Sequence, residues 1–179
     1  LDLSGTLPPS IGSLTNLMSK VIIELEGMTG TLPSSLGSLT GLKGSVVIES
    51  AQLTGTIPPV YASLSNMMSS FVLEDLPLTG SMPSSLGLLF TDLAHYFVFE
   101  DMPYLTGTLP NALCSMVKLG RSFRLNKLPL VSGTLPSCLA SISTLSTNFE
   151  VENLALTGTI PPSFGSMTSV QSIFQLAEL

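Results

Sequence analysis

Apolar and polar positions recur along this chain with one fixed spacing. A glycine flanked by Ser or Thr, followed by an apolar residue and then proline, returns every 25–27 residues. A fixed period of this length indicates stacked copies of one structural unit, here called coils. The glycines of this turn are Gly5, Gly30, Gly55, Gly80, Gly107, Gly133 and Gly158. The chain is therefore expected to form about seven coils.

Other apolar columns keep step with the turn. Three columns at three-residue spacing follow the proline, as Ile11, Leu14 and Leu17 do in the first coil, and they predict an irregular or 3₁₀ return segment. Four residues later comes a column that we call the spine, with another apolar column two residues beyond it, which is the spacing of a short strand. The spine consists of Val21, Val46, Phe71, Phe97, Phe123, Phe149 and Phe174.

Stacking such coils places every strand beside its equivalent in the next coil. The pattern therefore predicts a solenoid with a parallel β-sheet on one face and irregular or 3₁₀ segments on the other. Hydrophobic residues make up 44% of the chain, but they occur in short runs such as 21–23 and 97–99. These runs are far shorter than the roughly 20 residues that span a bilayer, so we expect no membrane span.

The charge composition narrows the class of partner. Twelve acidic residues outnumber six basic ones, giving a net charge of −6. This balance argues against nucleic acid and anionic lipid, which attract basic surfaces. Only 10% of residues are charged, so Ser, Thr and Gly must cover much of the surface. That composition is typical of a secreted or cell-surface protein.

Over its whole length the repeat resembles the plant-type class of leucine-rich repeat, whose signature runs LxxLxxLxLxxNxLxGxIPxxLGx. Its Thr-Gly-Thr-Leu-Pro form is similar to repeats of protist surface antigens and plant receptor ectodomains. The resemblance implies an extracellular leucine-rich-repeat solenoid. One departure concerns the family's asparagine, which bonds backbone groups of the turn and has no counterpart here. Its places hold Glu26, Ala51, Leu76, Met102, Leu128, Leu154 and Leu179.

The array shows no internal boundary, so residues 1–179 are expected to form a single solenoid. Leu1 and Leu179 fall on the same phase of the repeat, and neither end carries a polar capping repeat. Uncapped ends expose core leucines and an unpaired sheet edge. We therefore expect the array to be part of a longer solenoid or to stack end to end.

Two columns lie on the predicted outer face of the sheet. Between the core positions stand Ile22, Val47, Val72 and Val98. Such an apolar row is either an interface or a consequence of the strand preference of β-branched residues, covered by sugar or a loop.

At the strand ends stand Glu24, Glu49, Glu74 and Glu100. Like charges ~5 Å apart repel. A bridging divalent cation would relieve this repulsion. Without an Asp-rich calcium loop the sequence favours a solvated row with outward-fanning side chains or raised pKa values, and so predicts no metal site.

The turn also supplies two hydroxyl columns. The first is Ser4, Thr29, Thr54, Thr79, Thr106, Ser132 and Thr157, and the second is Thr6, Thr31, Thr56, Ser81, Thr108, Thr134 and Thr159. A regular Thr-x-Thr ladder resembles the ice-binding face of solenoid antifreeze proteins, and the same hydroxyls could be O-glycosylated. The simpler interpretation is that they satisfy backbone groups of the turn.

Candidate chemistry is sparse. Cys114 and Cys138 lie on the return segments of adjacent coils, where they form either a disulfide or two free thiols. The single histidine, His95, has no nucleophile and acid at matching phase, and no phosphate-binding or cofactor motif is present. The sequence thus predicts a module without catalysis or cofactor.

Taken together, these patterns predict a non-catalytic extracellular recognition or scaffold module. Its partners would be protein, glycan or further copies of itself, through end-to-end assembly, and its hydroxyls would carry O-linked sugar. The alternative function is an ice-binding protein that uses the hydroxyl ladder.

Overall fold

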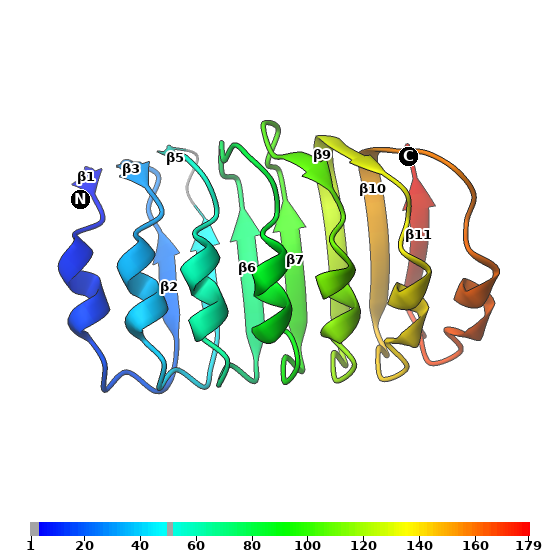
Figure 1. Cartoon of the computed structure of the whole chain (residues 1–179), viewed down its shortest axis with the longest axis horizontal. Coiled ribbons are helices and arrows are strands. Elements are labelled where there is room, and N and C mark those ends of the chain that lie inside the picture. The colour runs from blue at the N-terminus through cyan, green and yellow to red at the C-terminus, as the bar shows by residue number, and fades with distance from the viewer. Residues whose placement is uncertain (1–3, 50–51) are drawn as a thin grey trace.

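The computed structural model describes residues 4–49 and 52–179, so Leu1 and Ala51 lie outside the described residues. The chain winds into the predicted solenoid, with one 3₁₀ helix in each coil (Figure 1). Each helix begins just after the proline of the turn, where the fixed φ of that residue sets the entry of the chain. The helices are η1 (Pro9–Ser13), η2 (Ser34–Ser38), η3 (Pro59–Ser63), η4 (Ser84–Leu88), η5 (Asn111–Ser115), η6 (Ser137–Ser141) and η7 (Pro162–Ser166).

A parallel sheet forms one face of the solenoid, as the period-2 pattern predicts. Its strands pair in the order of the coils, each with its equivalent one coil further on. They are β2 (Val21–Glu24), β4 (Val46–Glu49), β6 (Ser70–Glu74), β7 (Tyr96–Glu100), β9 (Ser122–Gly133), β10 (Asn148–Leu156) and β11 (Ile173–Ala177).

The glycine turns form shorter strands beside this sheet. A three-stranded sheet joins the turns of the first three coils, and β8 pairs with the distal part of β9. These strands are β1 (Gly5–Thr6), β3 (Met28–Thr31), β5 (Leu53–Thr54) and β8 (Thr106–Thr108). In β9 and β10 the two extended pieces of a coil merge into one long strand.

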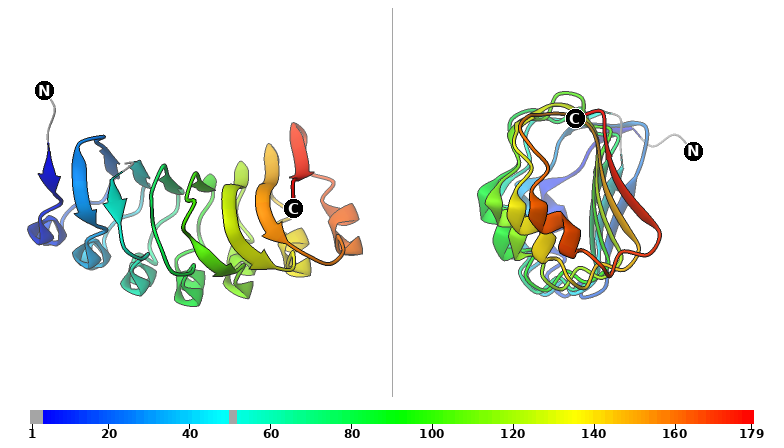
Figure 2. Two further views of the ribbon diagram at one scale, coloured as in Figure 1. Left: turned by 90° about the horizontal axis from the view of Figure 1, so that it is seen from above. Right: turned by 90° about the vertical axis from the view of Figure 1, so that its right-hand side faces the viewer.

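The core lies between the sheet and the row of 3₁₀ helices. Viewed along the solenoid, the strands overlay on one side and the helices on the other (Figure 2). The leucine columns close this space, since Leu36, Leu86 and Leu113 are buried on the helix side. The predicted spine faces them from the sheet and is buried at the six positions from Val21 to Phe149.

Stacked aromatic rings continue the spine through the last four coils. Ring centroids lie 5.6 Å apart between Phe97 and Phe123, and 5.1 Å apart with an interplanar angle of 7° between Phe123 and Phe149. Phe174 on the terminal strand β11 stacks on Phe149 but keeps 48% of its surface exposed. The same residue type therefore has neighbours on both sides at Phe123 and on one side at Phe174.

Four of the lost asparagine positions, Leu76, Met102, Leu128 and Leu154, belong to the core, whereas Glu26 and Leu179 are exposed. Leu76, Met102 and Leu128 are fully buried there. Backbone donors of the turn instead bond across coils: the Asp75 N–H donates to the Glu100 carbonyl and the Asp101 N–H to the Asn126 carbonyl, both at 3.2 Å. Inter-coil backbone bonds thus supply the partners that the asparagine gives in the family.

Two further features complete the fold. The Cys114 and Cys138 sulfurs are bonded, with Cα atoms 5.5 Å apart, and this disulfide joins η5 to η6. Within residues 4–49 and 52–179, no helix is long and apolar enough to cross a membrane.

We predict that Phe123→Ala destabilises the solenoid by about 3–5 kcal/mol, because it leaves a cavity between two stacked rings. Phe174→Ala serves as the matched control and should cost only about 1 kcal/mol, since half of that ring already faces solvent. Urea denaturation followed by circular dichroism measures both changes. Equal losses for the two variants would contradict the role assigned to the stacked spine.

Candidate binding surfaces

The outer face of the main sheet carries the predicted apolar column in strict register. Ile22 pairs with Val47, and Val47 with Val72. Val98 is next in the row, opposite Val72 on β7. Because the strands are parallel and in register, these side chains stand side by side at a spacing of ~4.8 Å.

Exposure declines along this column. Ile22 is 44% exposed, Val47 and Val72 are half-buried, and Val98 keeps only 9% of its surface. Val98, one of the four candidate binding residues of this row, is therefore buried and has little surface to offer a partner. That side chain lies between Val72 and Arg124 in the register, and the Arg124 guanidinium reaches back to Glu100 on the strand of Val98. The open apolar surface belongs to the first three coils.

The acidic column stands two residues further along the same strands. Glu24 pairs with Glu49, Glu49 with Glu74, and Glu74 with Glu100. No described basic residue forms an ion pair with any of the first three of these glutamates. Partial burial, together with the neighbouring carboxylates, raises the pKa of Glu49 and of Glu74 above its ordinary value of 4.5. Raised carboxyl pKa values, one of the two outcomes that the sequence favoured for this row, therefore occur at Glu49 and Glu74.

Beyond Glu74 a polar network binds Glu100, the next member of this column. Arg124 donates from Nε and Nη2 to the two carboxylate oxygens of Glu150, at 3.0 and 3.2 Å, and from Nη1 to Glu100 at 3.2 Å. Asn126 donates to the other Glu100 oxygen at 3.0 Å. Burial by itself lowers the pKa of Arg124, but the bonds to both glutamates outweigh it and raise this pKa. The acidic charge of the sheet face is therefore partly compensated by Arg124 in the later coils and is uncompensated in the earlier ones.

The structure offers little support for a cation site in this row. Among the residues that the structure describes, no group of three or more His, Cys, Asp or Glu side chains could hold a metal ion. Side chains one coil apart face the same direction, so they line up without converging on one point.

The two hydroxyl columns of the turn have different roles. In the first column every hydroxyl from Thr29 onward donates to the glycine carbonyl of the preceding coil, as Thr54 Oγ1 does to Gly30 at 3.1 Å and Thr79 Oγ1 to Gly55 at 3.1 Å. Thr29, Thr106, Ser132 and Thr157 repeat this bond. The simpler interpretation, in which hydroxyls satisfy the turn, holds for this column.

The Thr residues of the second column pack through their methyl groups instead, and Ser81 packs through its Cβ. Gly80 has a φ of 74°, and a Cβ added there would lie 3.0 Å from the Thr56 methyl carbon. Glycine is therefore favoured here for two reasons: other residues rarely adopt this φ, and a Cβ would lie tightly against the Thr56 methyl group. Side chains of this column are exposed, and their hydroxyls have no hydrogen-bond partner within residues 4–49 and 52–179. They leave a regular row of hydroxyls open to solvent.

A shallow groove runs between this second column and the starts of the 3₁₀ helices. It consists of two hollows of about 790 and 730 Å³, which share Thr56 and Pro59. Thr6 and Thr31 line the first hollow, and Ser81 and Thr108 the second, each facing prolines and serines of the helix starts. The groove therefore follows the open hydroxyls through the first five coils.

One contact was missed by reasoning from the sequence. Ser69 Oγ lies 3.1 Å from His95 Nδ1, one coil apart, and the Ser45 hydroxyl donates to Ser69 at 3.1 Å. The three residues sit just before their strands, and their alignment across coils was the available signal. No described carboxylate bonds His95. The arrangement is a chain of surface hydrogen bonds that lacks the acid of a catalytic triad.

We predict that the double variant Glu49→Gln, Glu74→Gln is more stable than the parent at pH 7. A folded-state pKa above the unfolded value gives stability that is present below the unfolded pKa and lost as the pH rises through the folded pKa. Neutral glutamines remove that loss, at roughly 0.2–1 kcal/mol for each like-charge cross-strand pair.

Urea midpoints measured from pH 7 downward test this expectation. The advantage of the variant should close as the pH falls below about 4.5, where the parent carboxyls also become neutral. Glu178→Gln, at the end of the sheet, controls for a simple change of net charge. An advantage that is unchanged at low pH would rule out carboxylate repulsion as its cause.

Comparisons with known proteins place the fold. No protein-family model and no curated protein matches the sequence. Among solved structures, the ectodomain of the Arabidopsis thaliana receptor kinase GASSHO1/SCHENGEN3, in complex with CASPARIAN STRIP INTEGRITY FACTOR 2, is 27% identical with a TM-score of 0.69. The match covers 99% of this chain and 23% of the receptor chain.

Two more solved structures share this fold. The Arabidopsis receptor kinase HAESA, in complex with the peptide hormone IDA and the co-receptor SERK1, is 25% identical with a TM-score of 0.80, over 96% of this chain and 28% of its own. A plant ice-binding protein is 18% identical with a TM-score of 0.50, over 97% of this chain and 78% of its own. This similarity shows a shared fold alone. The chain spans about a quarter of the two receptor chains. It has the leucine-rich-repeat solenoid fold and is similar to plant receptor ectodomains of that fold.

Proposed function

We propose that this chain is a non-catalytic extracellular recognition module, which binds a protein segment across the sheet face of its first coils. The observation that carries this proposal is the pairing of an open apolar row, Ile22 to Val72, with glutamates that have no basic partner among the described residues. Apolar surface next to uncompensated charge of one sign is a pattern of interfaces.

Similarity to the receptor ectodomains supports this proposal. HAESA and GASSHO1/SCHENGEN3 were solved with the peptide hormone IDA and with CASPARIAN STRIP INTEGRITY FACTOR 2, respectively. The disulfide between Cys114 and Cys138 supports an extracellular location, because disulfides persist mainly in oxidising compartments. The low density of charge agrees with that location.

The geometry of the face defines the partner's chemistry. The apolar and acidic columns lie two residues apart along each strand, which is about 7 Å. A complementary segment presents apolar side chains in one row and Lys or Arg in a second row at that distance. Such a partner also relieves the repulsion between Glu49 and Glu74, since opposite charge close to a carboxylate favours its ionised form. We therefore propose an extended basic and apolar peptide segment as the ligand.

Binding of a synthetic peptide that alternates Leu and Lys, measured by isothermal titration calorimetry, tests this function. The double variant Val47→Lys, Val72→Lys should bind at least about tenfold more weakly, because it places cations in the apolar row; tenfold corresponds to ~1.4 kcal/mol. Val60→Lys is the control, since Val60 is exposed on η3 across the core from the sheet. A Leu and Glu peptide of equal length should bind less than the Leu and Lys peptide. Equal binding of both peptides, or equal loss in the control, would refute the proposed face.

A second function, ice binding, is favoured by one observation. The second hydroxyl column is exposed at every coil, its methyl groups are held against the next glycine, and its hydroxyls are open to solvent. A rigid periodic row of hydroxyls can match the periodic surface of ice. We also propose the same hydroxyls as acceptors for O-linked sugar if the chain is glycosylated.

Thermal hysteresis of the unglycosylated protein tests the ice-binding proposal. The double variant Thr31→Tyr, Thr56→Tyr should abolish the activity by breaking the row. Thr15→Tyr, Thr40→Tyr makes the same chemical change on exposed residues outside the turn and should leave it intact. Absence of hysteresis in the parent protein would eliminate this function without affecting the peptide-binding proposal.

A further inference from the structure

The charges of this protein are segregated onto two opposite edges. All strands of the main sheet are parallel, so residues that precede the strands line one edge and residues that follow them line the other (Figure 1). We call these the basic edge and the acidic edge. The sequence shows only a net charge of −6, whereas the fold sorts the signs of the charges.

The basic edge carries four of the six basic residues of the chain. They precede strands β2, β4 and β9, and all four are exposed. They are Lys20, Lys43, Lys118 and Arg121. Among the described residues on this edge, Asp92 is the one acid, and it is paired with Lys118. Lys20 and Lys43 form no ion pair with any described residue, so their charges are open to a partner.

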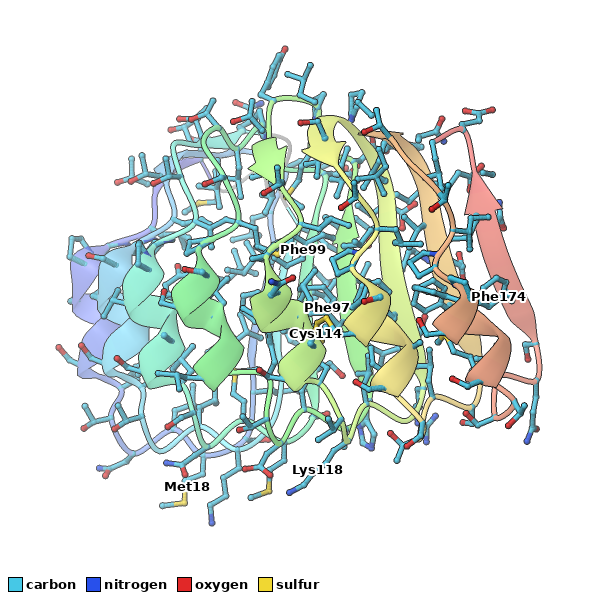
Figure 3. All side chains as sticks on the ribbon, turned by 45° about the vertical axis from the view of Figure 1, so that its right-hand side comes forward. Met18, Phe97, Phe99, Cys114, Lys118 and Phe174 are labelled. Atoms are coloured by element: carbon cyan, nitrogen blue, oxygen red, sulfur yellow. A yellow bond between two sulfur atoms is a disulfide. The ribbon has the colours of Figure 1, made fainter. Side chains whose placement is uncertain are left out.

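Exposed apolar side chains lie among these cations. Met18 is 62% exposed and Met68 is 52% exposed. Figure 3 shows the Met18 side chain pointing away from the core. A backbone ladder holds this row in place, because the Lys43 N–H donates to the Met18 carbonyl at 3.0 Å and the Met68 N–H to the Lys43 carbonyl at 2.9 Å. Met18, Lys43 and Met68 therefore form one fixed strip across three coils.

The acidic edge has the opposite character. Glu26 and Asp75 are exposed there, and no described residue forms an ion pair with either. In later coils of the same edge, Tyr104 after β7 is 56% exposed and Leu130 in the distal part of β9 is 51% exposed. Lys127 is the exception on this edge, and it is paired with Asp101. Each edge thus combines exposed apolar groups with unpaired charge of one sign.

We propose that the basic edge of one molecule docks onto the acidic edge of a second copy. The two surfaces carry complementary charges, and coil spacing repeats groups along both at the same ~4.8 Å interval, which permits several contacts in register. A contact between two different surfaces is heterologous and leaves one edge of each kind unused. The association therefore extends sideways, with solenoids side by side, unless rotation between copies closes a ring.

An anionic lipid surface is the main competing partner for the basic edge. The net charge of −6 opposes approach to anionic lipid, whereas the acidic edge is a complementary surface already present on the same chain. Exposed methionines fit either partner, since their flexible side chains adapt to different apolar surfaces. Charge complementarity therefore favours a second copy.

Sedimentation velocity of the full chain, over a range of protein concentrations and at low salt, tests the association. The parent protein should form species larger than a monomer at about 0.01 M salt and dissociate at about 1 M, where the Debye length falls from about 30 to about 3 Å. Two charge-reversed variants should each remain monomeric, with association at least about tenfold weaker. They are Lys20→Glu, Lys43→Glu on the basic edge and Glu26→Lys, Asp75→Lys on the acidic edge.

Mixing the two variants provides the decisive measurement. Each variant carries like charges on both edges, so it repels itself, but every edge of one complements an edge of the other. The equimolar mixture should recover association at low salt. Lys127 holds the position equivalent to Asp75 with nearly the same φ, 52° against 53°, so Asp75→Lys suits that backbone.

Controls separate this mechanism from effects of net charge and from lipid binding. Ser84→Glu, Ser137→Glu adds negative charge on the helix side and should leave association unchanged. A monomeric parent protein at low salt, or a mixture that stays monomeric, would overturn the proposal. So would a parent protein that stays monomeric but binds phosphatidylserine vesicles and loses this binding in the basic-edge variant. The basic-edge variant leaves the peptide-binding face unaltered, so titration of that variant with the Leu and Lys peptide reports on the proposed function independently of association.

Discussion

The register of parallel hydrogen bonds between neighbouring coils is the constraint on which the rest of this molecule depends. It holds each residue ~4.8 Å from its equivalent in the next coil. Any side chain type that recurs in the repeat therefore forms a column, whether contacts between its members at that spacing are favourable or not. Aromatic rings suit it, as the nearly parallel Phe123 and Phe149 show. The turn glycines suit it as well, because the Thr methyl of the preceding coil occupies the space that a Cβ would need.

Carboxylates repel one another at this spacing, and this repulsion distinguishes the sheet face of the early coils. Glu49 and Glu74 are held beside acidic neighbours and partly desolvated, so their pKa values rise. In the later coils Arg124 bridges Glu100 and Glu150 and reduces the repulsion there. The early coils keep the unfavourable arrangement. Residues that lower stability in the free protein are commonly those that serve binding, which is why the open face is the strongest candidate site.

The same register separates charges of opposite sign. A parallel strand brings its preceding residues to one edge and its following residues to the other, so the position of a charge within the repeat decides the edge it occupies. Lys20 and Lys43 precede their strands, whereas Glu26 and Asp75 follow theirs. A chain with a modest net charge thereby becomes polar across its width. That polarity gives the molecule two sides that can bind different partners.

The sequence by itself determined the solenoid, the spine, the 3₁₀ return and the exposure of the turn hydroxyls, because a repeat of 25–27 residues encodes neighbours that are one period apart. It could not determine how far long side chains reach. Only the tertiary structure decided that Arg124 bridges two coils, that Val98 is buried, and that Ser69 meets His95. It also decided which of the two hydroxyl columns is consumed by the turn. The reason is physical: backbone period fixes Cα positions, whereas rotamers, hydrogen bonds and burial depend on packing in three dimensions.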